Sequence, residues 1–154
     1  MSANYYQYAY VTTDWQRAMT DLGTLHQIGS WMEMPEGEFD TGPGRTAVCN
    51  FALAFKNGVQ FEVIQPLSGD SDVYRWGLPT EGYGMHFHHI GRHFADRAEF
   101  DREMARANTR WRSPIAAETM GGAYAYFDAR DELGHFCEYF SFPPGSHLEA
   151  VLRF

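Results

Sequence analysis

The amino-acid sequence predicts a single α+β domain whose two halves follow the same structural plan. A chain of 154 residues is long enough for one domain with a sizeable core and too short for two ordinary ones. Hydrophobic residues make up 44% of it and aromatic residues 16%, so burial can offset the entropy lost on folding. Each half contains a strand-like run, a helical pattern, a glycine-rich turn region and further strand-like segments, in that order.

The first half begins with a strand and a helix, both within "QYAYVTTDWQRAMTDL" (residues 7–22). The β-rich run at its start is closed by Asp14. After this aspartate, four apolar residues recur at helical spacing: Trp15, Ala18, Met19 and Leu22. We therefore expect a strand followed directly by a helix.

The second half repeats this arrangement in "HIGRHFADRAEFDREMARA" (residues 89–107). Its run is closed by Asp96, which can cap the following helix together with Glu99 three residues later. Three apolar residues then share one helical face: Phe100, Met104 and Ala107. Seven residues before the two closing aspartates stand Gln7 and His89, so the copies are offset by 82 residues (89 − 7 and 96 − 14).

Each half then passes through a glycine-rich turn region, "TGPGRT" (41–46) or "MGGAY" (120–124), and ends in an apolar strand that stops at a proline. These strands are "VQFEVIQP" with Glu62, and "HFCEYFSFP" with Glu138. A carboxylate inside a buried strand is costly unless it is paired or bound to a metal, which points to a shared metal site. The alternative is that both glutamates face solvent on a half-exposed sheet.

Charge and composition exclude several classes of partner. A formal net charge of -8 disfavours nucleic acid and anionic membranes, and leaves a neutral or basic small molecule as the partner. No stretch approaches the roughly 18 to 20 apolar residues that span a bilayer, and the first ten residues do not resemble a signal peptide. The two cysteines, Cys49 and Cys137, form no metal or disulfide motif. We expect a cytoplasmic protein.

Four segments in order resemble the vicinal oxygen chelate superfamily, also called the glyoxalase and bleomycin-resistance fold: "YQYAYVTTD", "FEVIQPLSG", "GMHFHHIG" and "GHFCEYF". The sequence looks most similar to the glyoxalase-4 and methylmalonyl-CoA-epimerase-like group, whose members have a similar "iELiqP" strand, a following "Y-x-x-x-L" (here within "SDVYRWGL") and a "GlHHi" strand. The resemblance implies two tandem βαβββ modules that form an open, cup-shaped mixed sheet with helices outside. Within the single domain 1–154, we expect module one at about 5–66, a connector at 67–82, module two at 83–142 and a tail at 143–154.

The resemblance also implies one divalent metal inside the cup, with two ligands from each module. Carried over by position, the ligands are Gln7 and Glu62 from the first module, and His89 and Glu138 from the second. Gln7 departs from the commoner histidine; its amide oxygen can bind a metal, as in the similar set of eukaryotic glyoxalase I, or it can support a neighbouring ligand instead. Such a set suits Zn, Ni, Mn, Co or Mg better than Fe.

"GMHFHHIGRH" (84–93) contains four of the seven histidines, and only His89 matches the ligand position. Strand alternation predicts that His86 and His88 point to the other face, towards helices or solvent. His93 lies four residues after His89 and shares its face if the strand is regular, so it is a candidate for a substrate contact or proton relay.

A divalent metal in such a site can polarise a substrate carbonyl and stabilise the enolate formed when a neighbouring proton is removed. The resemblance suggests Glu138 or Glu62 as the base, and therefore a glyoxalase- or epimerase-like isomerase or lyase acting on an apolar carbonyl compound. One alternative is a metal-free protein that binds and sequesters a small molecule. A second is an extradiol-type dioxygenase, which is disfavoured because Gln7 replaces the second histidine. The resemblance further implies a homodimer, in which the apolar end of the tail 143–154 could contact the partner.

Overall fold

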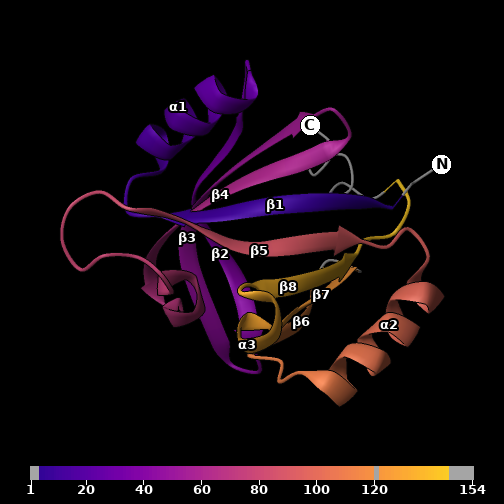
Figure 1. The fold of residues 1–154 in the computed structure, drawn as a ribbon. Coiled ribbons are helices and arrows are strands. Elements are labelled where there is room, and N and C mark those ends of the chain that lie inside the picture. Colours follow the sequence, from indigo (N-terminus) through magenta and orange to yellow (C-terminus); the bar gives the residue numbers. More distant parts are fainter. Residues whose placement is uncertain (1–3, 120–121, 146–154) are drawn as a thin grey trace.

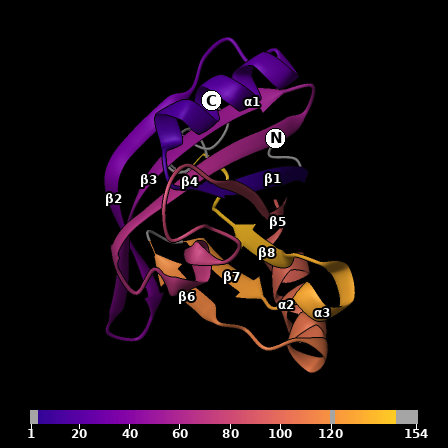
Figure 2. The same cartoon turned by 60° about the vertical axis from the view of Figure 1, so that its left-hand side comes forward.

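A computed structural model describes residues 4–119 and 122–145, which form one strongly curved eight-stranded sheet with helices on its outer side (Figures 1 and 2). The first module contains β1 (Tyr5–Thr12), α1 (Trp15–His26), β2 (Met32–Gly42), β3 (Arg45–Lys56) and β4 (Val59–Gly69). A short 3-10 helix (Asp72–Arg75) lies in the connection. The second module contains β5 (Met85–His93), α2 (Arg97–Arg110), β6 (Ile115–Thr119), β7 (Gly122–Phe127), α3 (Arg130–Leu133) and β8 (Phe136–Ser141). Within the described part of the chain, no helix combines the length and apolar character needed to cross a bilayer.

The strand order is β2-β3-β4-β1-β5-β8-β7-β6, with the first strands of the two modules side by side in the centre. β1 and β5 are antiparallel, whereas β1 pairs in parallel with β4 and β5 pairs in parallel with β8. Each module therefore has the same βαβββ topology, and the two are related by an approximate twofold axis between β1 and β5. This confirms the predicted α+β fold with a cup-shaped mixed sheet.

Both predicted helix starts are confirmed. The carboxylate of Asp14 accepts a hydrogen bond from the backbone N–H of Arg17 at 3.1 Å, and that of Asp96 accepts one from Ala98 at 3.0 Å. Such caps satisfy backbone donors that have no partner within a helix. The side chain of Glu99 was expected to take part in the second cap; its carboxylate instead forms an ion pair with an arginine of β5.

The helices cover the outer face of the sheet and leave the inner face to form the cup. α1 buries Ala18, Met19 and Leu22 against Ala52 and Val63 of the sheet. α2 packs in the same way over β7 and β8 (Figure 1). A separate apolar cluster fills the bottom of the inner side, and it consists of Val11, Cys49, Ile64, Tyr74, Ile115, Tyr126 and Phe136.

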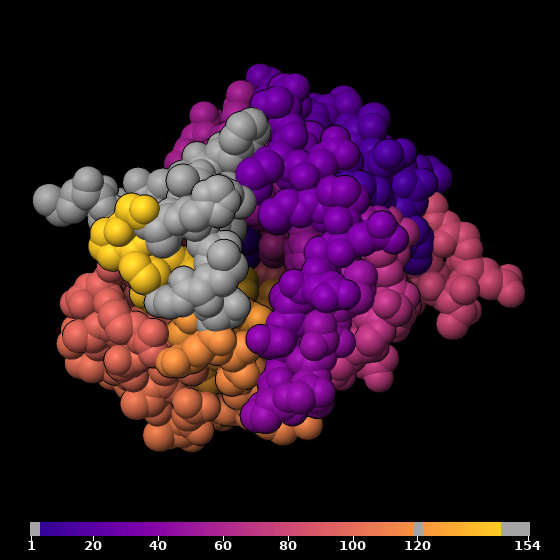
Figure 3. Space-filling model, turned by 180° about the vertical axis from the view of Figure 1, so that it is seen from behind, coloured from indigo at the N-terminus to yellow at the C-terminus, as the bar shows by residue number. Residues whose placement is uncertain are grey.

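The two edge strands, β2 and β6, approach each other and nearly close the cup (Figure 3). The hydroxyl of Tyr124 on β7 donates a hydrogen bond to the backbone carbonyl of Asp40 on β2, and so joins the two modules at this seam. The segment "TGPGRT" is the turn between β2 and β3, as predicted, with Gly44 at a φ of 68°. The corresponding segment of the second half falls partly on residues 120–121, outside the described residues.

One strand is longer than its sequence pattern predicts. β4 was expected to stop at Pro66, but it continues to Gly69. The pairing of β1 with β4 ends at Val11 and Ile64, so Pro66 lies where β4 has a ladder partner only on its β3 side. A proline without an N–H group is tolerated at such a local edge.

Candidate metal centre and its cavity

The four side chains expected to hold a metal lie on the inner face at equivalent register positions. Glu62 on β4 is paired with Ala9, two residues after Gln7 on β1. Glu138 on β8 is paired with Gly91, two residues after His89 on β5. Because side chains alternate along a strand, a separation of two residues keeps both members of each pair on one face. The approximate twofold axis thus brings a donor pair from each module to the same place.

The donor atoms converge around Nε2 of His89. This nitrogen lies 3.1 Å from Oε1 of Gln7, 3.2 Å from Oε2 of Glu138 and 3.5 Å from Oε2 of Glu62. One ligand atom from each of Glu62, His89 and Glu138 can be chosen so that all lie within 4.8 Å of one another. Tetrahedral donors about 2.1 Å from a common ion are roughly 3.4 Å apart, so the spacing fits a small divalent metal.

Burial makes this cluster costly without a further partner. His89 is fully buried and Glu62 is 8% exposed. Oε2 of Glu62 has only a long contact, 3.5 Å, with Nε2 of His89, and no other described residue bonds to it. A buried carboxylate oxygen of this kind fits a site for a cation.

The pKa values show that a proton occupies the centre in the metal-free protein. Burial raises the pKa of Glu62, although the neighbouring His89 opposes the shift. Burial alone lowers the pKa of His89, but the hydrogen bonds and charges of Glu138 and Glu62 more than compensate and raise it to about 9. At neutral pH, His89 is therefore an imidazolium whose Nε2–H faces three oxygen atoms. A metal bound there would replace that proton.

Gln7 is held with its oxygen towards the centre. Its amide nitrogen donates a hydrogen bond of 2.7 Å to Oε1 of Gln60, which leaves its own Oε1 facing His89. Space for this side chain depends on Gly91, because a Cβ there would lie only 2.7 Å from Oε1 of Gln7. Gln60 was not among the predicted site residues, although it precedes Glu62 by two positions on the same face.

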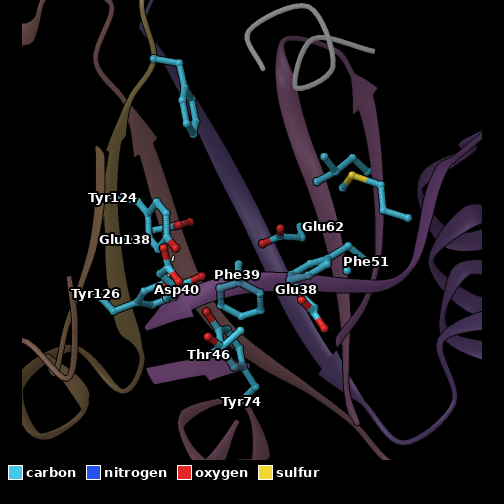
Figure 4. Close-up of a pocket in the computed structure, with 14 residues that line it drawn as sticks. Glu38, Phe39, Asp40, Thr46, Phe51, Glu62, Tyr74, Tyr124, Tyr126 and Glu138 are labelled. Carbon is cyan, nitrogen blue, oxygen red and sulfur yellow. Dashed lines mark hydrogen bonds between the residues drawn. The ribbon is translucent and has the colours of Figure 1, made fainter. Parts of the chain in front are cut away.

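Two members of the cluster, Glu62 and Glu138, line a cavity of about 490 Å³ (Figure 4). Glu62 and Glu138 point towards each other from its two sides (Figure 4). Its wall is mainly apolar and aromatic, with the following side chains: Met34, Phe39, Phe51, Leu53, Tyr74, Tyr124, Tyr126 and Phe142. This volume lies within the range of small-molecule sites, which are roughly 300 to 1,000 Å³.

A comparison with models of known protein families and with curated proteins finds no match to this sequence. Solved structures do match over nearly the whole chain. The methylmalonyl-CoA epimerase from Mycobacterium tuberculosis has a TM-score of 0.55 at 14% identity, covering 94% of this chain and 89% of its own. A hypothetical protein from Bacillus halodurans C-125 has a TM-score of 0.57 at 12% identity, covering 95% and 99%. A variant of the Streptomyces coelicolor methylmalonyl-CoA epimerase, in complex with 2-nitronate-propionyl-CoA, has a TM-score of 0.53 at 16% identity, covering 88% and 94%.

The chain has the vicinal oxygen chelate fold. The predicted resemblance is thus confirmed at the level of the fold, with epimerases among the structural neighbours. Within this fold, the four predicted metal ligands do lie together. Their binding of a metal stays a prediction.

The expectation that His86 and His88 point to the outer face of this fold was wrong. Ala9 is paired with His89 and Tyr10 with Phe87, so His88 is an extra residue in β5 and forms a β-bulge. The bulge breaks the alternation, and His88 packs inside the cup in ring contact with Tyr126 of β7. His86 also lies inward, with its ring against Trp76 at a centroid distance of 4.6 Å.

His93 lies on the inner face of β5, as expected, but at a distance from the metal centre. Four residues of strand separate it from His89, which is about 13 Å. It is 1% exposed and stacks on Tyr5 with ring centroids 4.6 Å apart. Among the described residues that line the cavity, His93 is not present. A catalytic role for it stays a prediction.

Proposed function

We propose that the protein is a metal-dependent enzyme that moves a proton at a carbon next to a carbonyl group, as an isomerase, epimerase or lyase. The observation that carries this proposal is the convergence of two donor pairs, one from each module, at the floor of an aromatic cavity. Two carboxylates balance the charge of a divalent ion, and Gln7 and His89 complete a set that suits Zn, Ni, Mn, Co or Mg. A bound ion would polarise the carbonyl oxygen and stabilise the negative charge that develops when the proton leaves.

The protein's own residues supply the base. Glu62 and Glu138 reach the cavity from opposite modules and so face opposite sides of a bound substrate. One such base serves an isomerase or a lyase, whereas an epimerase uses both, one on each face of the substrate carbon.

The lining of the cavity favours an apolar substrate that is uncharged or basic. None of the described residues that line it is a lysine or an arginine, and two exposed carboxylates, Glu38 and Asp40, add negative charge at its edge. A phosphate or a free carboxylate would therefore have no positively charged side chain to bind among these residues. A bound metal ion would be the one positive charge beside it. The Streptomyces structure contains a CoA compound; for this chain we propose a smaller substrate without phosphates.

The test is metal content by elemental mass spectrometry on protein purified without an affinity tag. We expect about one divalent ion per chain, and its loss in the double variant Glu62→Ala, Glu138→Ala. The matched control is the double variant Glu33→Ala, Glu81→Ala, which removes two exposed glutamates and should keep the ion. No ion in the wild-type protein after incubation with Zn(II), Ni(II) and Mn(II) would favour the alternative, a protein that binds and sequesters a small molecule.

Activity is tested by incubating the metal-loaded protein in D2O with a panel of apolar ketones and aldehydes. Proton transfer predicts deuterium incorporation next to the carbonyl, visible by NMR and lost in the Glu62→Ala, Glu138→Ala variant. Oxygen consumption with catechols, in place of exchange, would indicate a dioxygenase.

We also propose that the protein is a cytoplasmic homodimer. Support for the dimer comes from the superfamily resemblance and from Tyr6, which is 53% exposed on the outer side of β1. The end of the tail, residues 146–154, lies outside the described residues. Sedimentation at micromolar concentration tests the dimer, and a monomeric mass would contradict it.

A further inference from the structure

Behind the candidate metal ligand lies a chain of two hydrogen bonds that ends on the backbone. Nδ1 of His89 is 2.8 Å from Nδ1 of His88, and Nε2 of His88 is 2.8 Å from the backbone carbonyl oxygen of Val73. The bulge in β5 makes this contact possible, because it turns two consecutive side chains to the same side of the strand.

The positions of the protons follow from these distances. A carbonyl oxygen only accepts hydrogen bonds, so Nε2 of His88 carries a proton. Two nitrogen atoms 2.8 Å apart share one proton, so one of the two Nδ1 atoms is the donor and the other is the acceptor.

His88 is the acceptor because the two carboxylates of the centre face His89, whereas His88 lies among aromatic rings. It is fully buried, and its ring stacks between Tyr74 and Phe136 at centroid distances of 5.5 and 4.8 Å. Nε2 of His89 faces the carboxylates of Glu62 and Glu138, so the positive charge of the histidine pair is stabilised on His89. A neutral His88 with its proton on Nε2 has a free lone pair on Nδ1, so the shared proton belongs to Nδ1 of His89. The nitrogen of His89 that remains for a metal is then Nε2, which faces the donor cluster.

We propose that His88 is a positioning residue, which holds the ring and the tautomer of His89 so that Nε2 is presented to a metal ion. This inference rests on the proposed metal function. Metal-binding histidines commonly donate their second N–H to a carboxylate, a carbonyl or water, which fixes the ring and increases its basicity as a ligand. Here a second histidine, His88, accepts that hydrogen bond. The backbone carbonyl of Val73, in the connection between the modules, accepts the next one and so keeps the proton of His88 on Nε2.

Two variants separate positioning from packing. His88→Phe keeps an aromatic ring between Tyr74 and Phe136 but removes the acceptor. His88→Asn removes the ring but keeps an oxygen acceptor near the position of Nδ1. Positioning predicts that His88→Phe weakens Zn(II) binding by about 10- to 100-fold, as is typical when such a partner is lost. It predicts a dissociation constant within about threefold of wild type for His88→Asn, in spite of a lower melting temperature. A role in packing alone predicts the reverse order, and that order would overturn the inference.

A spectroscopic measurement on the wild-type protein tests the proton positions directly. With 15N-labelled histidine, NMR should show Nδ1 of His89 protonated and Nδ1 of His88 unprotonated, with and without Zn(II). The opposite assignment would overturn the inference even if neither variant folds. Failure of the proposed metal function can be distinguished from failure of this inference. In that case the wild-type protein would bind no Zn(II), whichever nitrogen atoms of His88 and His89 carry the protons. If the wild type binds Zn(II) and His88→Phe binds it equally well, only the role of His88 is refuted.

Discussion

Raising the pH should strengthen metal binding, because the metal and a proton compete for Nε2 of His89. The pKa of His89 is about 9 in the metal-free protein, since the hydrogen bonds and charges of Glu138 and Glu62 outweigh the effect of burial. Each ion that binds must therefore displace at least one proton at neutral pH. The direction is fixed by this pKa: affinity increases with pH up to about 9 and then levels off.

The size of the pH effect on metal affinity depends on how far the pKa of His89 lies above the pH of the measurement. At pH 7, only about one molecule in 100 has a free Nε2, which reduces the affinity by about 100-fold, or about 3 kcal/mol. Between pH 6.5 and 8.5, the association constant for Mn(II) should increase about tenfold per unit.

Equilibrium dialysis at several pH values measures this slope. Calorimetry in buffers of different ionisation enthalpy counts the protons released, and we expect about one or more per ion. An affinity that stays constant from pH 6.5 to 8.5, with no proton release, would refute the reasoning.

The same proton stabilises the metal-free fold. A pKa raised from 6.5 to about 9 contributes stability that is fully present below pH 6.5 and is lost as the pH rises to 9. The total loss is about 3 kcal/mol, and it should appear as a falling urea midpoint in the presence of a chelator. A midpoint that rises over this range would contradict the assignment.

Three substitutions test the fold that supports the site. Gly91→Ala places a Cβ 2.7 Å from Oε1 of Gln7, so we expect a loss of about 1 to 3 kcal/mol in urea unfolding and weaker metal binding. Its control is Gly29→Ala, where a Cβ meets nothing within 4 Å, and equal effects of the two would count against the contact. Asp14→Ala removes a helix cap and should cost about 1 kcal/mol, also measured with urea, whereas no change would show that the cap is not needed. Phe94→Ala empties a fully buried position and should cost about 3 to 5 kcal/mol; a melting temperature within a few degrees of wild type would disagree with the packing described above.

The fold could be predicted largely because both halves carry the same local signals. Asp14 and Asp96 cap their helices at corresponding positions, and the offset of 82 residues between the copies identifies β5 as the strand of the second half that is equivalent to β1. The end of β4 could not be predicted in this way. Whether a strand continues past Pro66 depends on which neighbour lies opposite, and that is a property of the assembled sheet.

For the site, too, local features could be predicted from the sequence, whereas features that depend on strand pairing could not. Glu62 and Glu138 could be identified from the sequence because burial of a carboxylate within an apolar strand is costly unless the carboxylate is paired or bound to a metal. The inward direction of His88 could not, since the bulge exists only in the pairing of β5 with β1. The contact between Gln60 and Gln7 likewise joins two strands that are far apart in the sequence.

The division of the donors between the modules has a mechanical consequence. Gln7 and Glu62 belong to one half of the chain, and His89 and Glu138 to the other, so neither half alone holds a complete set. An ion in the centre would act as a cross-link between the halves, beside the β1–β5 ladder and the Tyr124 seam. At a concentration 100 times its dissociation constant, it would add about 2.7 kcal/mol to the stability of the assembled cup. The supply of metal would then govern how well the protein withstands heat and proteolysis, as well as whether it is active.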